Sequence, residues 1–161
     1  MKLQHTLSYE ADPAAVFAVL SDPEYVDEKC RATGSLDTEV DVSVDGTDTV
    51  IATVRKLPAD DLPSFAKSFV GEAITVDQTE RWGPAAQDGS REGSLKATFR
   101  GTPMKVEATM RLSPGGAGSE LRVAGDVKSG IPLMGGTIES FAADQLTKGL
   151  DREAEVANAR L

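Results

Sequence analysis

Apolar residues near the end of the chain recur at steps of three and four, the spacing that places side chains on one face of an α-helix. Residues 131–158 are therefore predicted to form a long amphipathic helix, with Ser129 or Gly130 as N-cap and Pro132 in the first turn. At about 1.5 Å per residue this helix would be roughly 40 Å long. A one-sided helix of this length needs an apolar surface of matching length to lie on.

The preceding residues predict that surface, because apolar and polar side chains alternate with the period of two that is typical of half-buried β-strands. Asp45-Gly46 is a strong hairpin signal between the second and third strands. Because the turns between the last six strands are short, we expect these strands to pair antiparallel, each beside its predecessor. The predicted strands cover residues 3–10, 36–44, 49–57, 73–82, 95–100, 104–112 and 121–127.

Two Asp-Pro pairs, at residues 12–13 and 22–23, predict two short helices after the first strand, each with Asp as N-cap and Pro in the first turn. Segment 58–71 interrupts the sheet, and Asp60 or Asp61 is predicted to cap a third short helix there. The whole pattern predicts an α+β unit with the long helix on the dry face of a curved sheet.

Composition narrows the class of protein. The chain is long enough for one domain with a real core, expected to span residues 1–161. A formal net charge of −9, with no cluster of Lys and Arg, argues against a nucleic-acid partner. No apolar run is long enough to cross a bilayer, so stable membrane insertion is not expected. The chain starts without the apolar core of a signal peptide and Cys30 is its only cysteine, so a cytoplasmic location is expected.

Several framework signals carry a resemblance to a known superfamily. They are Tyr9-Glu10-Ala11-Asp12-Pro13 with Val16-Phe17, Asp22-Pro23-Glu24-Tyr25, Glu80-Arg81-Trp82 and the closing helix. Together with the order of elements, the chain resembles the START-like (SRPBCC) superfamily over essentially its whole length, and in detail the domain of unknown function family 2505. The resemblance implies the helix-grip fold, in which a curved seven-stranded antiparallel sheet wraps a long C-terminal helix. It also implies a cavity that holds an apolar small molecule; in some members the cavity hosts catalysis, but no catalytic motif of that kind carries over here.

The sizes of the side chains bear on whether such a cavity is open. One helix cannot fill the concave side of seven strands, and aromatic residues make up only 5% of the chain. Many presumed inward positions are small, namely Ala97, Ala108, Gly125, Ala142 and Ala143. Two interpretations follow: the space stays open for a ligand, or the small residues let the helix lie closer to the sheet.

Polar residues on a predicted inward face are the most informative site candidates. Gln78 and Glu80 share a strand face with Trp82. A buried carboxylate there would need a partner or a raised pKa, and it could orient a ligand hydroxyl or act as an acid. The alternative is a bulge or register change that turns both side chains outward.

The remaining predicted cavity-lining residues are His5, on a face with three apolar neighbours, and a set of large apolar side chains. That set is Phe99, Met110, Met134, Ile138 and Phe141. Trp82 is interpreted first as an anchor of the sheet and second as a lining residue. Phe65 and Phe69 are predicted either to face the pocket from a lid formed by residues 58–71 or to plug the end of the core.

Few residues in the chain offer catalytic or metal-binding chemistry. The chain has a single histidine, His5, and a single cysteine, Cys30, whereas a zinc site needs several such ligands, so no metal site is predicted. A lone histidine on an apolar face is interpreted as structural, and Cys30 has no sequence-level partner for nucleophilic catalysis. No catalytic residue and no cofactor are therefore predicted.

Three functions from different classes remain. The leading hypothesis is a binding or carrier module for a hydrophobic small molecule or lipid. The second is an enzyme of the cyclase or dehydratase type that uses Glu80 or His5 as acid or base in the cavity. The third is a protein-interaction domain with a filled core and an exposed apolar patch. The scarcity of His, Cys and paired inward carboxylates favours binding over catalysis.

Overall fold

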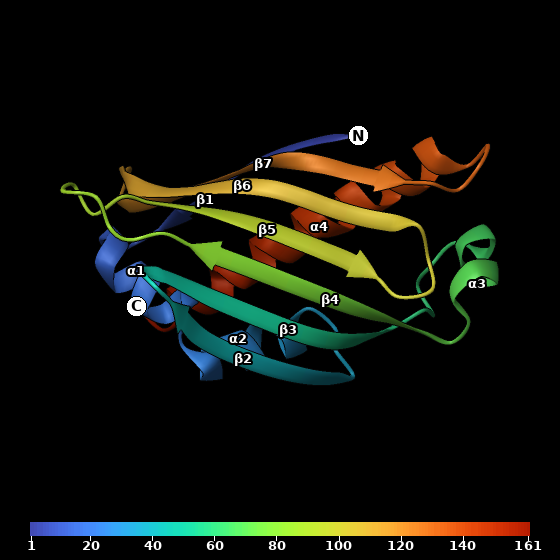
Figure 1. The fold of residues 1–161 in the computed structure, drawn as a ribbon, viewed down its shortest axis with the longest axis horizontal. Helices are drawn as coiled ribbons and strands as arrows, with labels where there is room; N and C mark the ends of the chain where they lie inside the picture. Colours follow the sequence, from blue (N-terminus) through green and yellow to red (C-terminus); the bar gives the residue numbers. More distant parts are fainter.

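Seven antiparallel strands form one sheet in the order β1-β7-β6-β5-β4-β3-β2, in a computed structural model that describes residues 1–161 (Figure 1). From β2 onward each strand lies beside its predecessor, and β1 closes the series by pairing with β7. The strands are β1 Lys2–Tyr9, β2 Asp37–Asp45, β3 Asp48–Pro58, β4 Ala73–Trp82, β5 Arg91–Phe99, β6 Met104–Gly115 and β7 Gly118–Ser129. The predicted α+β class, with a long C-terminal helix against an antiparallel sheet, is confirmed.

Four helices accompany the sheet: α1 Pro13–Leu20, α2 Pro23–Ala32, α3 Ser64–Val70 and α4 Gly135–Asn158. The two Asp-Pro signals act as predicted. The Asp12 carboxylate accepts a hydrogen bond from Ala15 N at 2.8 Å, and the Asp22 carboxylate accepts one from Glu24 N at 3.0 Å. Each bond satisfies an amide that the first turn of a helix leaves without a partner.

The long helix begins at Gly135, four residues later than the sequence predicted, and neither Ser129 nor Gly130 is its N-cap. The residues before it fold as a turn in which Leu133 has a positive φ of 65°. A glycine suits position 135 because the backbone of Ser129 lies close to it: a Cβ there would be 3.3 Å from the Ser129 carbonyl oxygen. The helix start is held instead by Glu139, whose carboxylate accepts hydrogen bonds from Ser129 N at 2.9 Å and from the N-terminal ammonium at 3.0 Å.

Two further local expectations were wrong. Pro63, rather than Asp60 or Asp61, is the N-cap of α3, and no side chain bonds the first turn of that helix. The strand predicted to begin at residue 95 begins earlier, because β5 already pairs with β6 from Arg91 onward. Strand pairing overrides the polar composition of that stretch.

α4 covers only part of the inner face of the sheet. It packs against β1, β7 and α2, and in Figure 1 it runs behind the sheet at an angle to the strands. The larger buried cluster lies where α1, α2 and the end of α4 meet the sheet, and it includes the fully buried Trp82 in an edge-to-face contact with Phe17 at 5.8 Å between ring centroids. A smaller cluster of six buried residues lies among β1, β4–β7 and the middle of α4.

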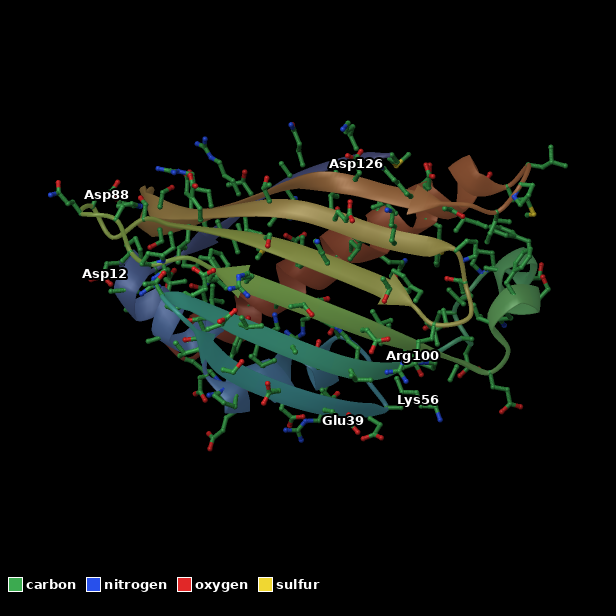
Figure 2. All side chains as sticks on the ribbon, viewed as in Figure 1. Asp12, Glu39, Lys56, Asp88, Arg100 and Asp126 are labelled. Carbon is green, nitrogen blue, oxygen red and sulfur yellow. The ribbon has the colours of Figure 1, made fainter.

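The outer face of the sheet is polar. Figure 2 shows charged side chains there, among them Glu39, Arg100 and Asp126, on the side turned away from α4. Arg100 donates two hydrogen bonds of 2.7 Å to the carboxylate of Asp77 on the neighbouring strand. One face of the sheet is therefore hydrated and the other is available for an apolar interior.

Gly125 tests how closely β7 and β6 approach. A Cβ at this position would lie against the carbonyl oxygen of Glu107 and within 2.6 Å of Ala108 Cα. We expect Gly125→Ala to lower the free energy of unfolding by about 1–3 kcal/mol, because backbone must move to admit the methyl group. Urea unfolding followed by circular dichroism measures this change. Gly83→Ala, where the nearest atom is 3.5 Å away, is the control and should be close to neutral; equal stability of both variants would contradict the packing.

Candidate functional site

A cavity of about 350 Å³ lies between α4 and the part of the sheet that α4 does not cover. Most of its wall comes from β3, β4 and β5, from α2 and α4, and from segment 58–70, which includes α3. Ligand pockets in proteins typically have volumes of about 300–1,000 Å³. The interior is thus open rather than packed to ordinary density.

The cavity wall is mainly apolar, since 22 of its 34 lining residues are hydrophobic. The sheet and α4 supply opposite sides of it. Strands β3–β5 contribute Leu57, Ile74, Leu95 and Phe99, and α4 contributes Ile138, Phe141, Ala142, Leu146 and Leu150. Their alternation on strands and helical spacing on α4 place them on inward faces.

A buried lysine organises the polar part of the wall. The Lys29 ammonium, on α2, donates to Glu80 Oε1 on β4 and to Glu153 Oε2 on α4, each at 3.2 Å. The Lys29 side chain is only 8% exposed, and those of Glu80 and Glu153 are 10% and 18% exposed. Buried charges need partners of this kind because an unpaired one would lose its hydration without compensation.

Glu80 is satisfied by three different donors. Besides Lys29, Gln78 Nε2 donates to Glu80 Oε1 at 3.1 Å and Trp82 Nε1 donates to Glu80 Oε2 at 3.2 Å. Alternate residues of a strand share a face, so Gln78, Glu80 and Trp82 meet on the inner side of β4. The alternative in which Glu80 turned outward is wrong: the strand keeps its register and Lys29 supplies the partner that a buried carboxylate needs.

The pKa of Lys29 reflects two opposing effects. Burial lowers it, but the carboxylates of Glu153 and Glu80 more than offset that effect, so the pKa stands well above its ordinary value. The ammonium is therefore charged at every physiological pH, and the lysine acts as a fixed cation rather than as a base.

Two buried tyrosines complete the cluster. Tyr25 donates from its hydroxyl to the carbonyl oxygen of Glu153 at 3.0 Å, and its ring lies 5.8 Å from the Lys29 ammonium. The hydroxyl of Tyr9 makes no hydrogen bond within the chain, although the residue is only 2% exposed and lines the cavity. Burial raises the pKa of both tyrosines above the ordinary value, and the nearby Glu153 carboxylate raises it further.

Most of the residues predicted to line a cavity do so. Those that line it are Gln78, Glu80, Trp82, Phe99, Met110, Ile138, Phe141 and, from α3, Phe69. Trp82 is both a lining residue and a buried anchor of the core.

Three predicted residues are not part of the wall. His5 pairs instead with Asp151, with 2.6 Å between Nε2 and Oδ1, because α4 lies directly on β1 there. Met134 sits in the turn before the late start of α4. On α3, Ala66 lines the cavity in place of its neighbour Phe65.

The sequence reasoning missed Lys29, Glu153, Tyr9, Tyr25 and Arg55 as members of the wall. A signal existed for two of them. Lys29 follows Tyr25 by four residues, on the buried side of α2, and Glu153 follows Leu146 by seven, on the cavity side of α4. Helical spacing alone would have placed both charged side chains on apolar helix faces. Lysine and glutamate rarely occupy such positions, so this placement would have marked them as candidate site residues.

The sheet, the long C-terminal helix and the cavity between them together define the START-like helix-grip fold. The chain belongs to a family described as "Protein of unknown function (DUF2505)", whose model matches residues 4–161. No curated protein matches the sequence.

Solved structures share the fold at low sequence identity. A START superfamily protein from Mycobacterium smegmatis is 15% identical with a TM-score of 0.59, and the match covers 99% of this chain and 95% of the other. A STAR-related lipid transfer protein from Xanthomonas axonopodis is 14% identical with a TM-score of 0.55, over 94% and 84% of the two chains. A protein from Thermus thermophilus is 15% identical with a TM-score of 0.65, over 99% and 96%.

None of the helices has the combination of length and hydropathy that crossing a membrane requires.

Removing the buried cation tests the polar cluster. We expect Lys29→Met to lower the free energy of unfolding by about 3–5 kcal/mol at neutral pH, since it leaves two carboxylates inside without a counter-charge. The unpaired carboxylates would have raised pKa values in the folded state. The loss should therefore shrink as the pH falls through those values toward about 4.3, below which the folded and unfolded states are both protonated. Urea unfolding of both proteins at several pH values measures this loss of unfolding free energy.

The control for that variant is Lys148→Met, which removes a lysine that is 68% exposed and pairs with Asp144 on the same helix. An exposed pair contributes roughly 0–1 kcal/mol, so the control should change little. Equal losses in both variants, or a Lys29→Met loss that does not depend on pH, would contradict the buried cluster.

The two tyrosines allow a spectroscopic test, because the chain contains no others. Their folded-state pKa values are raised, so the stability they contribute is present below about pH 10 and is lost as the pH rises past it. At about pH 11 the folded protein should show almost no tyrosinate absorbance, which should appear only with alkaline unfolding. Tyr9→Phe should halve the final amplitude. A smooth titration near pH 10 in protein that stays folded would contradict the burial of the rings.

Proposed function

We propose that this protein binds a hydrophobic small molecule or lipid in the cavity between the sheet and α4. The observation that carries the proposal is the cavity itself, about 350 Å³ of unfilled space with a mainly hydrophobic wall and one polar cluster. A ligand that hid about 250 Å² of apolar surface there would gain roughly 6 kcal/mol before the entropic loss of association. The START superfamily and lipid-transfer proteins among the fold's neighbours lend support by analogy.

The same geometry gives less support to the two other functions considered. An interaction domain with a filled core would not leave this volume open. An acid or base in the cavity would have to be His5, which lies outside it, or Glu80, whose two oxygens already accept from three donors. Binding therefore remains the function that the site supports best.

Segment 58–71 is proposed as the lid through which a ligand enters. α3 has no buried residue, and Phe69, which lines the cavity, is 46% exposed. Figure 1 shows α3 (green) beyond the end of the strands, near the turn that leads from β7 into α4. Few buried apolar contacts hold this segment, which is the physical condition for opening at low free energy.

Native mass spectrometry of protein purified from its own host tests binding directly. We expect a mass increment from a non-covalent apolar ligand, lost on denaturation. Protein that is empty by this measurement, and whose melting temperature does not shift with any member of a panel of lipids and apolar small molecules, would contradict the proposal.

A cavity-filling substitution tests where the ligand lies. Gly149 lines the cavity from the middle of α4, and a Cβ there would meet nothing within 4 Å. Gly149→Leu should fill part of the space and lower ligand affinity at least about tenfold, while the fold tolerates or gains from the loss of a helical glycine. Binding of an apolar fluorescent dye measures the affinity.

Gly136→Leu is the matched control, because Gly136 also has open space around its Cβ but lies on the exposed side of α4 and does not line the cavity. The control should bind like the unmodified protein. Equal affinity of the two variants would show that the dye binds elsewhere.

A further inference from the structure

The charged residues of the cavity wall are not balanced. Two cations, Lys29 and Arg55, face three carboxylates, those of Asp61, Glu80 and Glu153. The wall as a whole therefore carries one excess negative charge, and the buried cluster around Lys29 carries the same excess by itself. Charge of this sign inside an apolar cavity disfavours an anion beside it.

Three polar atoms of the cluster have no partner within the chain. Lys29 occupies Oε2 of Glu153 but leaves Oε1 without a donor. Gln78 donates through Nε2 and leaves its carbonyl oxygen free. The Tyr9 hydroxyl makes no hydrogen bond at all, although Tyr9 is only 2% exposed and lines the cavity. The polar end of the cavity thus offers two free acceptor oxygens and one free hydroxyl, and Lys29 and Gln78 each keep one further N–H that no atom of the chain accepts.

A neutral hydroxyl matches this set of atoms. It can donate one hydrogen bond to a carboxylate or amide oxygen and accept one from a phenol at the same time. A carboxylate cannot donate, so it would leave both free acceptors unpaired and would place a further negative charge beside Glu80 and Glu153. An ammonium has no acceptor atom, so it would leave the proton of the Tyr9 phenol without a partner.

We infer that the ligand is an amphipathic molecule with a hydroxyl at its polar end, an alcohol or a phenol, and that the cavity selects it over the corresponding carboxylic acid. This inference rests on the proposed function and names the chemistry that the same site selects. Tyr9, Gln78 and Glu153 are the residues that determine the specificity.

Arg55 is the other cation of the cavity wall, and an anionic ligand in place of a hydroxyl would have to pair with it. Its guanidinium already donates to neutral oxygens around the end of α2: to Ser35 Oγ at 2.9 Å, to Thr33 Oγ1 at 2.7 Å, and to the carbonyl oxygens of Cys30 at 3.2 Å and Thr33 at 3.4 Å. These bonds hold Arg55 against the end of the helix, where the backbone dipole favours a cation.

The test compares two probes that share one apolar tail, decanol and decanoic acid, at neutral pH, where the acid is ionised. Each displaces an apolar fluorescent dye from the cavity. We expect decanol to bind at least about tenfold more tightly than decanoate, the difference made by roughly one well-placed hydrogen bond. Equal binding of the two, or tighter binding of decanoate, would overturn the inference while leaving the proposed function standing. If the dye and both probes fail to bind, the proposed function fails as well.

Two variants assign the effect to named atoms. Tyr9→Phe removes only a hydroxyl that has no partner in the folded chain, so the protein should fold normally, bind decanol several-fold more weakly and bind decanoate unchanged. Glu153→Gln removes one negative charge, so it should improve the binding of decanoate and reduce the preference of the cavity for decanol over decanoate. Glu155→Gln, on the exposed side of α4 in a pair with Arg152, is the matched control and should leave the preference unchanged.

Arg55→Gln separates the inference from its rival. If decanoate binds as well as decanol and Arg55→Gln abolishes its binding, the polar end is an anion site and the hydroxyl inference is wrong. Retention of the decanol preference in Arg55→Gln supports the assignment to the Lys29 cluster.

Discussion

The buried contact of Lys29 with Glu80 and Glu153 is the interaction on which the interior of this protein depends. It joins α2, β4 and α4 at one point, and each of the three elements comes from a distant part of the chain. A buried ion pair adds little net stability compared with an apolar packing of the same volume, but its partners cannot be separated without a large penalty. Its role here is therefore positional: it holds α4 at a set distance from β4.

The cavity follows from that distance. α4 rests on β1 and β7, where Gly125 is one of the facing strand residues, and it stands away from β3, β4 and β5. The large apolar side chains on those strands, such as Ile74 and Phe99, then meet open space instead of the helix. The polar cluster closes one side of that space, so the cavity pairs an apolar wall with a few buried polar groups, the combination that is usual for small-molecule sites.

The fold could be predicted from the sequence because it depends on local patterns. The period of two identified all seven strands, and the Asp-Pro pairs located the starts of α1 and α2 to the residue. The start of α4 could not be predicted, because it depends on Glu139 bonding to Ser129 and to the N-terminus, contacts that no local pattern encodes.

The site was predicted only in part, and for the same reason. Glu80 and Gln78 were found because alternation placed them on an apolar face. Their partner Lys29 lies 51 residues away from Glu80 in the sequence, and Glu153 is 124 residues away from Lys29. A lysine or a glutamate on an amphipathic helix normally lies in water. Only the tertiary structure shows that Lys29 pairs with Glu80 and with Glu153 inside the protein.

The measurement that tests this account most directly is a crystal structure of the protein under xenon pressure, since xenon enters apolar cavities that are empty and large enough. The account predicts a xenon atom between α4 and the β4–β5 part of the sheet, near Ile74, Phe99 and Phe141, with the Lys29 contacts intact. An interior in which side chains occupy that volume and no xenon binds would contradict it.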